Sequence, residues 1–209
     1  MYIAPVDRSA GEHEWRSFVE AQGFGHLVAA GRGRDVPVVV PTQFLLDGDS
    51  VLLHLAGPNP VFDALAEQPR VLLSVAADWA FIPSDWKALD GEDPALGIPT
   101  TYYGAVQLIG TARVDSEPES VAAVLRRQLA ALQPGVDVAD PAGAHGPKLR
   151  AIRGITVAVE EVRAKFKYGG NVDDAHRRAV VERLRDRAGP GDRAAAAHAE
   201  RRGSAPPAR

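Results

Sequence analysis

An aromatic pair that leads into a long apolar run is the feature that most constrains the fold. Tyr102 and Tyr103 precede the apolar run Val106–Val114, and Gly104 lies in between. This pattern predicts a strand that is broken at the glycine and resumes at Val106. Several short strands of this kind, with few helices, favour a small antiparallel barrel. The other expected strands cover residues 26–30, 36–46, 51–55, 71–76 and 155–162.

Turn residues and helix patterns complete this expectation. Asp47-Gly48-Asp49 is a strong hairpin signal, and Pro37 and Pro41 confine their strand to a sheet edge or a bulge. We therefore expect an α+β fold, mainly β, in which helices pack around the ends of the barrel. The expected helices cover residues 10–21, 60–67, 117–132 and 172–187.

Composition limits the classes of function. The chain of 209 residues is 45% hydrophobic and 24% charged, which is typical of a globular protein with a core. It has no cysteine, which excludes disulfides, thiolate metal sites and a cysteine nucleophile. The start lacks a basic region followed by an apolar run, and no apolar run is long enough to span a bilayer. We therefore expect a cytoplasmic protein without membrane contact.

Charge is unevenly distributed along the chain. The net charge is −3, so no global positive field attracts nucleic acid. Residues 172–209 are basic, but a solvated helix with a disordered end explains this better than DNA contact. Because the Ala, Arg, Gly and Pro bias after Gly189 cannot bury a core, we expect a folded domain at 1–188 and a disordered tail at 189–209.

Four motifs in a fixed order carry a family resemblance. They are His54–Pro60, Trp79–Trp86, Pro99–Val114 and Lys165–Asn171. Their order and spacing resemble the PaiB family, the FMN-binding negative transcriptional regulators of bacteria. The resemblance implies a split β-barrel of the pyridoxamine-phosphate-oxidase type. It also implies a homodimer that holds FMN in a groove between the two subunits.

The first motif places a histidine at a strand end before a helix start. His54 precedes a tight turn, and Asn59 is placed to cap the helix that Pro60 begins. The helix N-terminus favours anions such as a flavin phosphate. The family turn reads Ala-Arg-Ala-Asn-Pro, and here Gly57 replaces the arginine. The alternative is that His54 is only a half-buried residue at the end of a strand.

The second and third motifs offer hydroxyls and aromatic rings. The family pattern Pro-Thr-Trp-Asn-Tyr keeps Thr100 and Tyr103 here, whereas Thr101 and Tyr102 replace the Trp and Asn. The hydroxyls can bond a phosphate or an isoalloxazine edge, and Tyr102 can supply some of the lost stacking surface. Trp86 matches the family's loop tryptophan and can cover a flavin ring or pack within the protein. Thr100 can equally cap a turn while the tyrosines pack.

The last motif pairs two lysines. Lys165 and Lys167 alternate on a strand, so both ammonium groups are expected on the same side, where they can close on an anion. A solvated strand edge is the alternative. Lys87 is a further departure from the family pattern, since it replaces a tyrosine.

These motifs leave three hypotheses open. The first is an FMN-containing homodimeric regulator, for which DNA as a partner rests on the family label alone, because no helix-turn-helix pattern is visible. The second is a flavin- or haem-dependent oxidoreductase in which His54 is the axial ligand of the haem. The third is a dimer that has lost its cofactor. No metal motif and no acid–base pair is evident, so we expect the flavin to supply any redox chemistry.

Overall fold

The computed structural model describes residues 1–88, 93–143 and 145–203. The chain forms two compact units. The first unit comprises Met1–Phe18, Ala76–Val106 and the chain from Arg163 onward. The second unit comprises Val19–Val75 and Gln107–Val162.

The chain forms a seven-stranded, mainly antiparallel sheet with the order β2-β1-β5-β6-β7-β4-β3. The second unit contains four of these strands and parts of the other three. Leu27 on β1 pairs with Val40 on β2 and with Leu73 on β5, and Leu53 on β4 pairs with Ile155 on β7. The strands are β1 (Phe24–Ala29), β2 (Val38–Gln43), β3 (Leu45–Asp47), β4 (Ser50–Ala56), β5 (Arg70–Ile82), β6 (Thr100–Asp115) and β7 (Ile152–Lys167). The last three are long and contribute residues to both units.

Local signals fix much of this sheet. The hairpin expected at residues 47–49 joins β3 to β4, and Gly48 takes the positive φ of +57° that such a turn requires. The prolines Pro37 and Pro41 lie before and within β2, which is an edge strand of the sheet, as expected. The single strand expected over residues 36–46 is wrong, because β2 and β3 are separate strands at opposite edges of the sheet. Leu27, Leu53, Leu73, Leu108 and Ile155 are fully buried and form part of the core.

Two helices of the second unit follow the predicted ranges closely, α2 (Val61–Glu67) and α3 (Pro118–Leu132). The short helix α4 (Gly146–Leu149) was not predicted. Val121 and Ala122 on α3 pack with Leu149 on α4 in a small separate cluster. α1 (Glu12–Gln22) confirms the amphipathic helix expected at 10–21.

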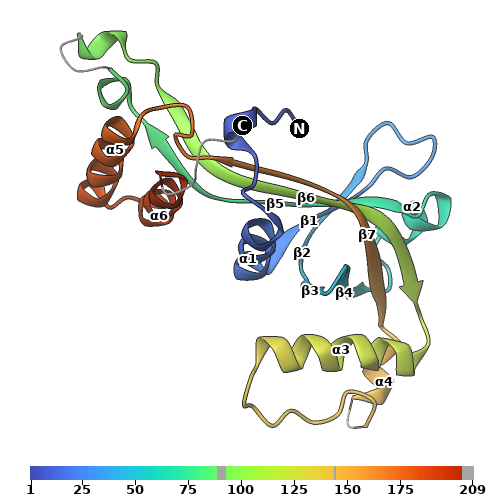
Figure 1. Cartoon of the computed structure of the whole chain (residues 1–209). Helices are drawn as coiled ribbons and strands as arrows, with labels where there is room; N and C mark the ends of the chain where they lie inside the picture. The colour runs from blue at the N-terminus through green and yellow to red at the C-terminus, as the bar shows by residue number, and fades with distance from the viewer. Residues whose placement is uncertain (89–92, 144, 204–209) are drawn as a thin grey trace. The chain divides into compact units, whose positions relative to one another are not determined.

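The first unit is built on the remaining parts of β5, β6 and β7. Its core contains Phe18, Tyr102, Phe166, Tyr168 and Leu184, which are all at most 4% exposed. The other elements are the short helices η1 (Pro5–Asp7), η2 (Ser84–Trp86) and η3 (Pro94–Leu96), and the helices α5 (Asp174–Arg187) and α6 (Asp192–Gly203), which pack side by side (Figure 1).

A bulge in β5 changes which alternate side chains of the strand are buried. Asp78 has a positive φ of +54°, which is uncommon for a residue other than glycine. Before the bulge Val75 is buried, and after it Ala80 and Ile82 are buried. The intervening side chains of Trp79 and Phe81 are consequently 61% and 50% exposed.

The structure corrects three strand boundaries. β6 runs through Gly104 without the expected break, and the glycine is needed because an added Cβ would lie 2.6 Å from Phe18 Cε2. β5 continues past Ala76 to Ile82, and β7 continues past Val162 to Lys167. The sequence underestimated these strands because polar and small residues interrupt their apolar runs.

The expected disorder from Gly189 onward is wrong as far as Gly203, because residues 192–203 form α6. Ala195, Ala196 and Ala199 are at most 2% exposed. The backbone of Gly191 approaches β5 so closely that an added Cβ would overlap Trp79 O. The alanine content that resembled a disordered tail favours a closely packed helix. The end of the predicted tail, residues 204–209, lies outside the described residues.

Among the residues that the structure describes, no helix has the length and apolar character needed to cross a membrane.

Candidate functional site

A lysine and a threonine from adjacent strands meet in the first unit. Lys167 Nζ on β7 donates a hydrogen bond of 2.6 Å to Thr100 Oγ1 at the start of β6. Both residues are half-buried. The strand entry therefore presents a positive charge beside a hydroxyl, which is the donor set that the sequence predicted for an anion.

Lys165, two residues earlier, has other partners. Its Nζ donates to Tyr2 O at 3.2 Å and lies 3.8 Å from Asp7 Oδ2. The same ammonium lies over the rings of Tyr2 and Tyr103, 5.9 and 5.5 Å from their centroids. Lys165 is only 9% exposed. It therefore holds the N-terminal segment on β7, and the structure gives the two lysines different partners.

Asp7 contributes to the electrostatics of this region. Burial raises the pKa of its carboxyl, and the charges of Lys165, Lys167 and Arg202 oppose that shift. The Asp7 carboxylate, which lies 3.8 Å from Lys165 Nζ, is thus itself poorly solvated.

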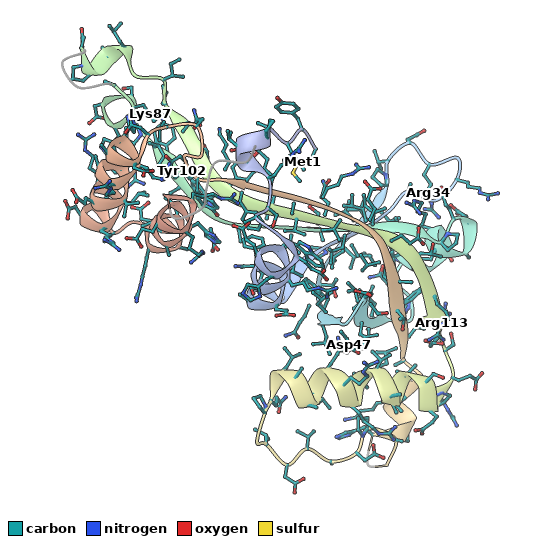
Figure 2. The ribbon with its side chains drawn as sticks, viewed as in Figure 1. Met1, Arg34, Asp47, Lys87, Tyr102 and Arg113 are labelled. Carbon is teal, nitrogen blue, oxygen red and sulfur yellow. The ribbon has the colours of Figure 1, made fainter. Side chains whose placement is uncertain are left out.

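Lys87 is a cation that the predicted site did not include. It ends η2, where its backbone N–H donates to Ser84 O, and it lies beside α5 (Figure 2). Burial lowers the pKa of the Lys87 ammonium, and the positive charge of Lys167 lowers it further. The only signal in the sequence was that a lysine replaces a tyrosine of the family pattern.

Trp86, next to Lys87, is half-buried against α5. The guanidinium of Arg187 lies 4.7 Å from the centroid of its ring. Arg183 Nη1 donates to Asp85 O at 3.1 Å. One face of the indole is therefore covered by the protein's own arginine, which favours the packing alternative for this tryptophan.

Tyr102 is a core residue rather than a surface for stacking. It is 1% exposed and packs edge-to-face on Tyr168, with ring centroids 6.0 Å apart. Burial raises the pKa of its hydroxyl to about 12. The expected stacking role of Tyr102 is corrected, because neither face of the ring is accessible. Thr101 and Tyr103, its neighbours on β6, are half-buried.

His54, in the second unit, is exposed and held by an amide. His54 Nδ1 lies 2.7 Å from Gln128 Oε1, while Gln128 Nε2 donates to Leu52 O at 3.2 Å. Because the second bond fixes the amide orientation, its oxygen faces the imidazole and Nδ1 carries the proton. Nε2 is then the nitrogen with the available lone pair.

Asn59 has the role at the helix entry that the sequence predicted. Its Oδ1 accepts a hydrogen bond of 3.0 Å from the N–H of Val61, where α2 begins one residue later than expected. In the preceding turn Gly57 N donates to Ala151 O at 2.8 Å. α2 has seven residues, and anion binding at its N-terminus stays a prediction.

The predicted site residues thus fall into two groups. The first unit holds Trp86, Thr100, Thr101, Tyr102, Tyr103, Lys165 and Lys167, among which Lys167 bonds Thr100 and Lys165 lies over the ring of Tyr103. His54 and Asn59 belong to the second unit. That a single ligand contacts both groups stays a prediction.

The comparison with protein families decides the assignment. The family model described as "Putative FMN-binding domain" matches residues 1–161. The chain belongs to this FMN-binding family. The family membership confirms the resemblance inferred from the four motifs. A similar relative is "Protease synthase and sporulation protein PAI 2" of Bacillus subtilis (strain 168), which is 25% identical over 197 residues and covers 91% of this chain and 92% of the relative.

Solved structures show the same fold. The flavocytochrome Anf3 from Azotobacter vinelandii is 21% identical with a TM-score of 0.57, and covers 80% of this chain and 77% of its own. The FAD and heme binding protein from Mycobacterium smegmatis is 18% identical with a TM-score of 0.59, and covers 77% of this chain and 73% of its own. These likenesses support the split-barrel fold of flavin-binding proteins, as predicted.

Proposed function

We propose that this chain is an FMN-binding protein of the PaiB type, which works as a flavin-containing homodimer and regulates transcription. The proposal rests on the family match, together with the 2.6 Å hydrogen bond from Lys167 Nζ to Thr100 Oγ1. A half-buried ammonium beside a hydroxyl suits a phosphate group, and FMN differs from riboflavin by that group. When bound, the flavin supplies the redox chemistry.

Exposed apolar side chains support the homodimer. Trp79 and Phe81 project from the same side of β5, since they are two residues apart after the bulge. Leu96 and Ile98, in the same unit, are 70% and 79% exposed. The family resemblance implies that a second copy of the chain covers this apolar surface.

Regulation of transcription rests on the resemblance to the PaiB family. The flavin is the part of the molecule that senses redox state or a metabolite. The test is a mobility shift with DNA from the region upstream of the chain's own gene, with oxidised FMN, with reduced FMN and without flavin. A shift that depends on the flavin state supports regulation, and the absence of any shift in all three contradicts direct DNA binding.

FMN binding itself has a direct test. Protein purified from a bacterial host is expected to be yellow, or to quench the fluorescence of added FMN during titration. A colourless protein that also leaves FMN fluorescence unchanged would contradict the proposal.

A haem-dependent oxidoreductase is the second candidate, and the hydrogen bond of His54 favours it. An imidazole that donates from Nδ1 to an amide oxygen presents Nε2 in the way that metal-bound histidines do. His54 would hold the haem iron, and the iron would supply the redox chemistry. A Soret band after haem reconstitution that is lost in His54→Ala supports this candidate. No Soret band in the unchanged protein removes it.

A further inference from the structure

The two C-terminal helices form a cavity that the proposed function does not use. α5 and α6 pack side by side (Figure 1), and a cavity of about 450 Å³ lies between them, within the first unit. The family model matches residues 1–161, so both helices lie outside the part of the chain that assigns it to the FMN-binding family. A volume of this size falls in the range of roughly 300–1,000 Å³ that small-molecule sites occupy.

Apolar side chains form the floor of the cavity. Leu184 on α5 and Ala196 on α6 are at most 2% exposed, and Ala197 on α6 is half-buried. These side chains contain only carbon and hydrogen, so they offer a ligand no hydrogen-bonding group. A floor of this composition favours an apolar group that is thereby removed from water.

The rim of the cavity carries an arginine without a counter-ion. Arg193, the second residue of α6, has no hydrogen-bond or ion-pair partner among the residues that the structure describes. Its neighbour Asp192 cannot serve as one, because the Asp192 carboxylate accepts from Arg187 Nε and from the Gly189 N–H, both at 2.8 Å. Asp192 is also only 1% exposed. The guanidinium of Arg193 is therefore available to an external anion.

An ion pair limits the length of the cavity. Arg185 on α5 and Glu200 on α6 bond each other across the two helices. Both also line the next cavity along the helices, which has a volume of about 450 Å³, so the ion pair separates the two cavities. On α6 the distance from Arg193 to Glu200 corresponds to a rise of about 10 Å. A short ligand fits this length, whereas a long docked helix would have to cross the ion pair.

The charges at the cavity decide the head group of the ligand. Glu200 is the carboxylate among the described lining residues, and Arg185 neutralises it. Arg193 then leaves one positive charge at the end of the cavity that lies away from Glu200. A carboxylate matches a guanidinium through two parallel hydrogen bonds.

We infer that this cavity is a binding site for a small carboxylic acid with an apolar body, such as a short fatty acid or an aromatic acid. Arg193 pairs with the ionised carboxylate, and the apolar body lies on Leu184, Ala196 and Ala197. The inference does not depend on flavin binding, because none of the residues predicted for FMN is among the described residues that line the cavity.

A titration with octanoate, a short fatty acid, tests the site. NMR spectra of the full chain labelled at its alanine methyl groups follow the binding. We expect octanoate to shift the signals of Ala196 and Ala197 and to leave that of Ala122, a buried residue of α3 in the second unit, unchanged. Octanol has the same chain without the charge and should bind about tenfold more weakly or less.

Three variants separate the contribution of the charge from that of the cavity. Arg193→Gln should weaken octanoate binding about tenfold or more and remove the preference for octanoate over octanol. Ala197→Phe fills the cavity and should weaken the binding of both ligands. Arg178→Gln is the matched control, because Arg178 on α5 is also exposed and without a described partner but lines the neighbouring cavity. It should bind octanoate as the unchanged protein does. Circular dichroism shows that each variant is folded, and Arg193→Gln decides the matter if Ala197→Phe is not.

Three results would overturn the inference. The first is an unchanged spectrum of Ala196 and Ala197 at millimolar octanoate. The second is octanoate binding that Arg193→Gln leaves unaffected or that octanol matches in affinity. The third is an equal loss in Arg193→Gln and Arg178→Gln, which would mean that binding follows the overall charge of the two helices.

Discussion

His198 on α6 is joined to Asp78 on β5 by a hydrogen bond of 2.9 Å between Nε2 and Oδ2, although 120 residues separate them in the sequence. Arg201 lies 2.8 Å from His198 Nδ1, so Nδ1 accepts and Nε2 carries the proton. The imidazole also stacks on Tyr168 with centroids 4.5 Å apart. His198 thus connects α6 to the bulge of β5.

We predict that this connection is needed for stability. His198→Ala removes the stacked ring and leaves the Asp78 carboxylate without its donor, and should cost about 2–3 kcal/mol. In a chain of this length that lowers Tm by roughly 5–10 °C. Asp78→Asn should cost less than about 1 kcal/mol, because asparagine accepts the same bond and tolerates a positive φ. Thermal unfolding followed by circular dichroism measures the loss of stability in each variant. An equal fall in Tm for His198→Ala and Asp78→Asn would contradict the prediction.

A truncation tests α6 as a whole. A chain that ends at Gly189 loses the packed Ala195, Ala196 and Ala199 together with the 2.8 Å bond between Arg187 Nε and Asp192 Oδ2. It should unfold at a lower urea concentration than the full chain. A chain that ends at Gly203 keeps every contact described for α6 and serves as the control. Equal midpoints for the full chain and the chain ending at Gly189 would show that α6 contributes nothing to stability.

Local signals in the sequence were sufficient for much of the fold. The hairpin at Gly48, the capping role of Asn59 and the edge position of Pro41 depend on neighbouring residues alone, and all three are confirmed. The order of the four motifs was enough to identify the family.

Long-range contacts explain what the sequence did not reveal. Asp78 at the bulge bonds His198 on α6, and the alanine-rich sequence of α6, without large apolar residues, did not predict a packed helix. The effect of Lys167 on Lys87 requires β7 and η2 to be brought together. The burial of Tyr102 depends on Tyr168 from another strand. Each of these contacts joins residues that are far apart in the sequence, so no local sequence pattern indicates it.

A matched pair of tyrosine variants tests the core of the first unit. The hydroxyl of Tyr102 is buried without a partner among the described residues, whereas Tyr168 donates to Asp78 O at 3.1 Å. Tyr102→Phe should therefore raise the free energy of unfolding at neutral pH by about 1 kcal/mol, and Tyr168→Phe should lower it by about 1 kcal/mol. Urea unfolding measures both changes. A loss of stability in Tyr102→Phe would show that the hydroxyl has a partner.

The same two tyrosines predict the alkaline limit of stability. Burial raises the pKa of Tyr102 to about 12 and raises that of Tyr168 also, so the folded state holds both protons more tightly than the unfolded state. Their contribution is complete below about pH 10 and is lost as pH rises towards 12 and beyond. Each proton contributes a slope of about 1.4 kcal/mol per pH unit. Unfolding at pH 9, 10 and 11 should show a shallower decline for Tyr102→Phe, and an unchanged slope would refute the assignment.

The exposed aromatic side chains of β5 predict the oligomeric state. The unchanged protein should scatter light as a particle of about twice the 22.2 kDa chain mass. Trp79→Arg places a charge on the proposed interface and should shift the protein to the monomer at micromolar concentration. Phe24 on β1, which is 54% exposed, provides the control Phe24→Arg. A monomeric unchanged protein, or a dimer that persists in Trp79→Arg, counts against this interface.

Restoration of the family arginine should strengthen FMN binding. The backbone of Gly57 does not have a positive φ, and an added Cβ would lie 3.3 Å from Ala151 O, so a side chain needs only a small adjustment. A guanidinium in this turn can pair with a phosphate through two hydrogen bonds, and Gly57→Arg should tighten FMN binding by about ten- to a hundredfold. Gly57→Gln has a polar side chain without the charge and is the control. Fluorescence titration with FMN and riboflavin separates the cases. An equal gain for both ligands would indicate a contact with the ring system rather than the phosphate, and no gain for either would mean that the turn does not face the flavin.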